Sequence, residues 1–128
     1  MIHAIDHINL VVSDLGKSVQ FYTKLLGFRE TKRAHLEGKW IEAIVGLKGI
    51  SADVVYILAS AGEPRLELLC YKSPKGEAIP VNSLANTIGL RHIAMRVDGI
   101  HNMAKRLKDA GVKVISEPVV VPASTITH

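Results

Sequence analysis

Two histidines and one glutamate are the residues of this chain whose types and places could bind a metal ion together. His7 and His92 each lie near the start of a short apolar segment, and they are 92 − 7 = 85 residues apart. Glu67 lies in a third apolar segment, between Leu66 and Leu68. Imidazole nitrogen and carboxylate oxygen suit Zn, Ni, Co, Mn or Fe(II), provided that rigid elements hold the ligands face to face. The three residues therefore predict a site for a divalent metal ion.

The segments that carry the two histidines belong to a repeat. Residues 5–12 and 90–97 are each apolar with a His near the start, and each leads into an amphipathic helix closed by a glycine. Self-similarity over most of a chain indicates a duplicated module. A purely structural histidine has no reason to recur at the matching place in both copies, so the repeat favours a shared metal site. His7 or Glu67 taken alone would more often be an ordinary strand residue.

Helices are predicted at equivalent places in both copies. Apolar residues recur at the spacing of one helical face over 15–26 and again over 100–110. Each helix has a candidate N-cap before it and a glycine that can end it. These flanking residues are Asp14 and Gly27 for the first helix, and Asp98 and Gly111 for the second.

Strands are predicted before each helix and between the two helices. Side chains of a strand alternate between its faces, so Ile8, Leu10 and Val12 share the face that lies under the helix. His7 then points the other way, together with Asn9, and His92 does the same in the second copy. Further strands are predicted near residues 28–36, 40–45, 53–60, 65–71 and 112–115, with a hairpin turn at 61–64.

Length and composition are typical of one globular domain. The chain has 128 residues, of which 48% are hydrophobic and 22% charged. No apolar run could cross a bilayer and no export signal is visible at the start, so we expect a cytoplasmic protein without membrane contact. The one cysteine, Cys70, excludes an intrachain disulfide and a cysteine-based zinc site. Outside the proposed site, His3, His35 and His101 are expected to be surface residues without convergent partners.

The charge of the chain is positive but dispersed. Its net charge is +4, the 16 Lys and Arg residues are scattered, and aromatic residues make up only 5%. No nucleic-acid-binding signature is present. We therefore expect a small-molecule substrate, with the positive charge favouring an acidic one, and no nucleic-acid partner.

Four segments together resemble the vicinal oxygen chelate superfamily of glyoxalases, bleomycin resistance proteins and dioxygenases. They are residues 6–12 (DHINLVV), 21–28 (FYTKLLGF), 66–69 (LELL) and 89–98 (GLRHIAMRVD). The sequence is most similar to methylmalonyl-CoA epimerase and glyoxalase I. The resemblance implies an α+β fold, in which two βαβββ modules form a curved mixed sheet around a pocket, and a homodimer. Carried over by position, the metal ligands are His7, Glu67 and His92.

The resemblance implies a single glyoxalase-like domain over residues 1–128. Module one covers 1–72, a connection covers 73–89, and an incomplete module two covers 90–128. The family's fourth ligand, a Glu from the last strand, has no counterpart here, because Glu117 stands too early and His128 is terminal. We expect a chain shorter than the working protein; a pocket completed by a partner, or an open coordination position, are the alternatives.

The activity that the resemblance implies is that of a metal-dependent lyase or isomerase. Its metal acts as a Lewis acid and stabilises an enediolate or enolate of a small oxygenated substrate. The catalytic base stays unassigned. One alternative is an Fe(II) extradiol-type dioxygenase, whose ligands are two histidines and a carboxylate, although that carboxylate comes from the last strand. The other is a metal-free protein that binds an antibiotic or a similar small molecule.

Overall fold

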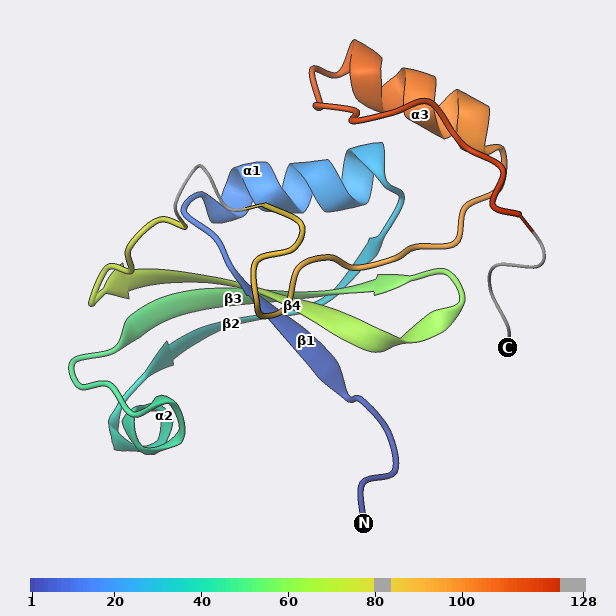
Figure 1. The fold of residues 1–128 in the computed structure, drawn as a ribbon. Coiled ribbons are helices and arrows are strands. Elements are labelled where there is room, and N and C mark those ends of the chain that lie inside the picture. Colours follow the sequence, from blue (N-terminus) through green and yellow to red (C-terminus); the bar gives the residue numbers. More distant parts are fainter. Residues whose placement is uncertain (80–83, 123–128) are drawn as a thin grey trace. The chain divides into compact units, whose positions relative to one another are not determined.

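A four-stranded mixed sheet forms the centre of the first part of the chain (Figure 1). Its strand order is β1-β4-β3-β2, in which β1 runs parallel to β4 and the other neighbours are antiparallel. This curved, open sheet with its helices confirms the predicted α+β class. The strands are β1 (His7–Val11), β2 (Arg29–Glu37), β3 (Ser51–Ala59) and β4 (Gly62–Ser73).

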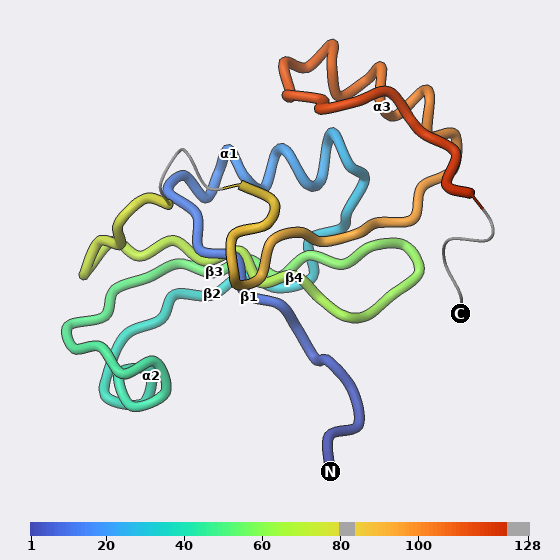
Figure 2. The backbone as a smooth tube through the Cα atoms, viewed as in Figure 1, coloured from blue at the N-terminus to red at the C-terminus, as the bar shows by residue number. Residues whose placement is uncertain are grey.

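The computed structural model describes residues 1–79 and 84–122. The chain divides into two compact units, Met1–Pro80 and Val81–His128. The first unit holds the sheet, and the second holds helix α3 (Ile100–Asp109). The backbone trace in Figure 2 follows the chain through both units.

The two predicted helices are present. The first consists of α1 (Leu15–Gln20) and a π-helical turn, η1 (Phe21–Leu25). Asp14 caps it by accepting a hydrogen bond from the backbone N of Lys17 at 3.0 Å, as predicted. The prediction of Asp98 as the second cap was wrong, because the N-cap of α3 is Gly99 and makes no side-chain hydrogen bond.

A short helix stands where the sequence predicts a strand over residues 40–45. α2 (Lys39–Val45) lies between Gly38 and Gly46, whose φ angles of 100° and 73° suit glycine and interrupt a strand. Ile41 is the buried residue of α2. The apolar run 40–45 therefore packs through one side chain, whereas a strand would bury every second side chain. The strand prediction for this segment was therefore wrong.

The strands predicted at 90–97 and 112–115 were also wrong. Both segments lie outside regular structure, and α3 is the regular element of the described part of the second unit. An alternating pattern suits a strand, but a strand forms only where a neighbour accepts its backbone hydrogen bonds.

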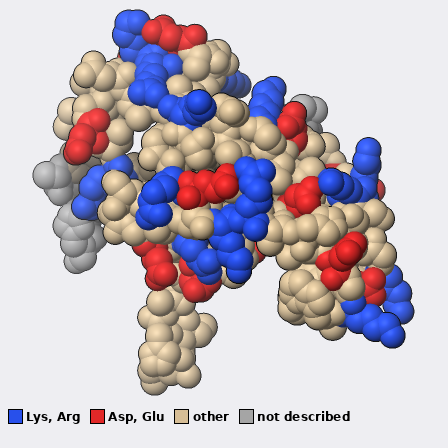
Figure 3. All heavy atoms as spheres, turned by 180° about the vertical axis from the view of Figure 1, so that it is seen from behind, with Lys and Arg blue, Asp and Glu red and all other residues tan. Residues whose placement is uncertain are grey.

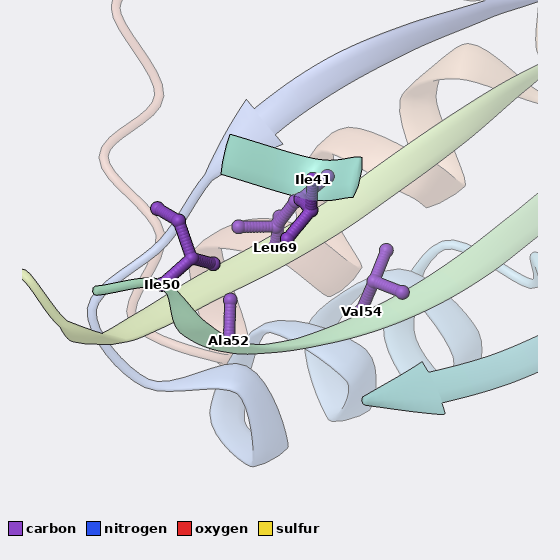
Figure 4. Close-up of a cluster of buried hydrophobic side chains, with 5 residues drawn as sticks. All are labelled: Ile41, Ile50, Ala52, Val54 and Leu69. Carbon is purple, nitrogen blue, oxygen red and sulfur yellow. The ribbon is translucent and has the colours of Figure 1, made fainter. Parts of the chain in front are cut away.

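The sheet of the first unit packs on both of its faces. On the α1 face, Val55, Ile57 and Leu68 are fully buried or nearly so, and α1 lies over β3 and β4 (Figure 1). On the opposite face, the α2 face, an apolar cluster packs beside α2 (Figure 4). Its members are Ile41, Ile50, Ala52, Val54 and Leu69. The α2 face also carries His7 and Glu67, which do not belong to that cluster.

Charges of both signs are interspersed on the surface that Figure 3 displays. Several of them form ion pairs, such as Arg33 with Glu30 and Lys105 with Asp109. Over the described ranges, every helix is too short or too polar to span a lipid bilayer.

Candidate metal centre

A row of polar side chains crosses the α2 face from β1 to β3. Asn9 on β1, Glu67 on β4 and Tyr56 on β3 are direct neighbours in the sheet register. The amide of Asn9 donates to Oε1 of Glu67 at 2.6 Å, and the hydroxyl of Tyr56 donates to Oε2 at 2.5 Å. Since both carboxylate oxygens accept a hydrogen bond and the side chain is only 13% exposed, Glu67 is held in one orientation.

His7 lies beside this row, with its two ring nitrogens between two carboxylates. Nδ1 is 2.6 Å from Oδ2 of Asp6, and Nε2 is 3.8 Å from Oε2 of Glu67. A carboxylate only accepts hydrogen bonds, so Nδ1 carries a proton, and whenever the ring is neutral its lone pair is on Nε2. That lone pair faces Glu67 across a gap too long for a hydrogen bond.

Arg65 connects the surroundings of the two residues. Its Nη2 donates to Oδ2 of Asp6 at 2.7 Å, and its guanidinium lies 4.5 Å from the centroid of the Tyr56 ring. The hydrogen bonds from His7 and from Arg65 hold the pKa of Asp6 below its ordinary value. Burial, followed by the hydrogen bond to Glu67, raises the pKa of Tyr56 to about 12, so its hydroxyl stays a donor near neutral pH.

The His7 and Glu67 pair fits a divalent metal ion. Two bonds of about 2.1 Å at a tetrahedral angle separate two ligand atoms by roughly 3.4 Å, near the observed 3.8 Å. A carboxylate on the other ring nitrogen is also the usual support of a metal-binding histidine. The pair does not make a complete site, because the described residues contain no group of three or more His, Cys, Asp or Glu that could hold a metal ion.

The remaining predicted residues lie in the second unit. His92 is exposed and belongs to the irregular segment 90–97, so its meeting with His7 and Glu67 stays a prediction. Glu117 is exposed and forms an ion pair with Lys108. His128 lies outside the described residues.

Asp6 and Tyr56 support the two candidate ligands and were not predicted from the sequence. Asp6 precedes His7 directly, and a carboxylate beside a candidate ligand was a signal that could have found it. Tyr56 lies eleven residues before Glu67, and only the strand register brings them together.

His35 is a second histidine placed between carboxylates, on the α1 face near the end of β2. Nδ1 lies 2.8 Å from Oδ1 of Asp53, and Nε2 lies 3.3 Å from Oε2 of Glu37. Lys72 pairs with the other oxygen of Asp53 at 2.9 Å. The hydrogen bonds to Asp53 and then to Glu37 raise the pKa of His35. The expectation that His35 has no convergent partners was therefore wrong, although it is a surface residue.

Comparisons with known proteins agree with this fold. The family model of the Glyoxalase/Bleomycin resistance protein/Dioxygenase superfamily matches residues 4–127. A probable lactoylglutathione lyase of Synechocystis is 30% identical over 114 residues, which cover 88% of this chain and 73% of that protein.

Solved structures share the arrangement of elements. A glyoxalase family protein of Bacillus cereus superposes with a TM-score of 0.87 at 24% identity, over 95% of this chain and 81% of its own. Leishmania major glyoxalase I gives 0.63 at 17% identity, over 92% and 73%. The fosfomycin resistance protein FosX of Listeria monocytogenes, as a variant in complex with Mn(II) and 1S,2S-dihydroxypropylphosphonic acid, gives 0.56 at 20%, over 94% and 79%. The chain thus belongs to the glyoxalase, bleomycin resistance protein and dioxygenase superfamily.

Proposed function

We propose that this chain is a divalent-metal-dependent lyase or isomerase of the glyoxalase I and methylmalonyl-CoA epimerase type. The observation that carries the proposal is the position of His7 Nε2, 3.8 Å from Oε2 of the fixed carboxylate of Glu67. The similarity to a probable lactoylglutathione lyase supports the class of reaction. The substrate is a small oxygenated molecule, and the positive net charge favours an acidic one.

His7 and Glu67 would hold the metal ion, and His92 of the second unit would complete the ligand set. Nitrogen and oxygen donors of this kind suit Zn, Ni, Co, Mn or Fe(II). When bound, such an ion supplies a Lewis acid that stabilises an enediolate or enolate.

Residues of the first unit hold the two proposed ligands, His7 and Glu67, in position. Asp6 keeps the proton of His7 on Nδ1, and Asn9 and Tyr56 hold the two oxygens of Glu67. Leu69, two residues along β4, belongs to the buried apolar cluster of the same face, so one side of the site is bordered by side chains that exclude water. Glu67 is proposed as a ligand and not as the base that moves the substrate proton.

The two alternative functions have weaker support. A metal-free binding protein would not need His7 Nε2 and Glu67 Oε2 to stand at the separation of two ligands of one metal ion. An extradiol-type dioxygenase would take its carboxylate from the last strand of the second module, whereas Glu67 is on β4, in the first module. Family resemblance also supports a homodimer, which sedimentation of the purified protein would detect.

Metal content tests the proposal. In protein purified without chelator, we expect about one divalent ion per chain by plasma mass spectrometry, and a loss of about tenfold or more in His7→Ala and Glu67→Gln. His35→Ala is the matched control, because it removes a histidine of similar exposure that also touches a carboxylate. Equal metal content in all four proteins would overturn the metal assignment.

Turnover tests the reaction class separately. The metal-loaded protein should form lactoylglutathione from its hemithioacetal, or exchange the α-proton of an acyl thioester with solvent deuterium. His7→Ala should lose this activity, and His35→Ala should keep it. A protein that binds metal but does neither reaction would refute the lyase or isomerase assignment.

A further inference from the structure

The proposed ligand His7 and three side chains near it form a closed ring of contacts. The three are Asp6, Tyr56 and Arg65. Asp6 contacts the ring of His7 at Nδ1, and the His7 ring meets Tyr56 edge to face with centroids 5.8 Å apart. The guanidinium of Arg65 lies over the ring of Tyr56 and donates a hydrogen bond to Asp6, which closes the ring of contacts. Glu67 joins this ring through the hydroxyl of Tyr56.

We infer that Asp6, Tyr56 and Arg65 are positioning residues, which fix His7 and Glu67 in their metal-binding forms before any metal binds. This inference rests on the function proposed above. Such supports act on ligand affinity without touching the ion, because they select the tautomer and the orientation of each ligand.

Asp6 decides which nitrogen of His7 can bind. With the proton held on Nδ1, the lone pair is on Nε2, the nitrogen that faces Glu67. The opposite tautomer would place an N–H toward Glu67 and leave no donor atom for a metal on that side.

Tyr56 decides where the carboxylate of Glu67 points. Its hydroxyl binds Oε2, the same oxygen that faces His7, and Asn9 binds Oε1. A carboxylate oxygen accepts more than one partner, so the hydrogen bond from Tyr56 leaves room for a metal bond.

Arg65 ties the two supports together. Asp6 is exposed, and an exposed carboxylate without a bonded partner would sample several rotamers. The guanidinium of Arg65 bonds to Asp6 and stacks on Tyr56, so the two are linked through one planar group. The effects of changing Asp6 and Tyr56 should therefore be coupled.

The first test needs no metal. Nitrogen-15 NMR of the His7 ring in chelator-treated protein should show the neutral ring protonated on Nδ1. Asp6→Ala should move the proton toward Nε2, Asp6→Glu should restore the original tautomer in part, and Arg65→Gln should give an intermediate result. Arg33→Gln, which breaks an ion pair elsewhere in the first unit, is the control and should change nothing. A His7 ring that keeps its Nδ1 proton in Asp6→Ala would overturn the inference.

The second test measures cobalt(II) affinity by titration. Asp6→Ala and Tyr56→Phe should each weaken binding by about 10–100-fold, and the double variant should lose less than the product of the two. Strict additivity would refute the link through Arg65. A wild-type protein that binds no cobalt(II), zinc or nickel would defeat the proposed function, whereas the NMR result would still decide the role of Asp6.

Discussion

The two faces of the β-sheet each carry a histidine beside a carboxylate, and the surroundings of the two histidines differ. His7 and His35 are 38% and 41% exposed, with Nδ1 2.6 Å and 2.8 Å from a carboxylate oxygen. They differ at Nε2. His7 faces Glu67, which is 13% exposed and bound by two donors, whereas His35 faces Glu37, which is 70% exposed. What distinguishes a candidate ligand is therefore the support behind its partner, and not the contact with a carboxylate.

The charges around the two histidines differ as well. On the α1 face, Lys72 pairs with the free oxygen of Asp53, so the carboxylate beside His35 is already matched by a cation. Such exposed networks contribute little to stability. On the α2 face the cation is Arg65, which bonds to Oδ2 of Asp6, the same oxygen that Nδ1 of His7 contacts.

The largest effect is expected from the core of the α1 face. Leu68→Ala should lower the free energy of unfolding by about 2–5 kcal/mol, because it leaves a cavity at a fully buried site. Urea denaturation measures this loss. Val11→Ala on the exposed side of β1 is the control and should cost less than about 0.5 kcal/mol. If the core of the α1 face and the proposed site on the α2 face act separately, Leu68→Ala protein that has folded should still bind metal. Loss of metal binding by the folded variant would contradict that separation.

A smaller effect is expected at the polar row of the α2 face. Tyr56→Phe should lower the free energy of unfolding of metal-free protein by about 1–2 kcal/mol, since a part-buried hydrogen bond to a carboxylate is lost. Tyr71→Phe, on the same face against the apolar cluster, is the matched variant and should cost less. A cost for Tyr71→Phe equal to that of Tyr56→Phe would show that the loss of a hydroxyl on this face, and not of the hydrogen bond to Glu67, accounts for the effect.

The smallest effect is a pH dependence at His35. Asp53 and then Glu37 raise its pKa, while Lys72 and Arg33 near Asp53 temper the negative charge that it meets. A raised folded-state pKa stabilises the fold below the unfolded value of about 6.5. That stabilisation is lost as the pH rises through the folded-state pKa. The melting temperature of wild-type protein should therefore fall more over this range than that of His35→Gln. Parallel melting profiles of the two proteins would remove His35 as the source.

Much of the first unit could be predicted because its signals are local. Alternation identified β1 and β4, and helical spacing with Asp14 identified α1. The run from Trp40 to Val45 was ambiguous, since a short apolar segment suits a helix or a strand equally. Residues 90–97 have the alternating pattern of a strand. Whether they form one depends on a neighbouring strand from elsewhere in the chain, which the local pattern does not identify.

The candidate site was predictable only in part, for a geometric reason. His7 and Glu67 came from residue type and repeat, but their support depends on strand register. A hairpin turn at 61–64 would set Glu67 opposite Leu58. The observed strands resume at Gly62, with an irregularity between Ile57 and Ala59, and this sets Glu67 opposite Tyr56. A shift of two residues in the turn thus exchanges a leucine for the tyrosine that holds the carboxylate.

The position of β1 at one edge of the sheet has a consequence for how the site assembles. β1 pairs with β4 and carries His7 and Asn9, while Glu67 lies far along the chain on β4. The two ligands are neighbours only after the long intervening segment has folded and β1 has docked. An ion held there would bind the chain only while β1 is paired with β4. Binding of the ion and pairing of β1 would therefore be coupled in one equilibrium. Detachment of this short edge strand alone would then release the ion without melting the rest of the sheet.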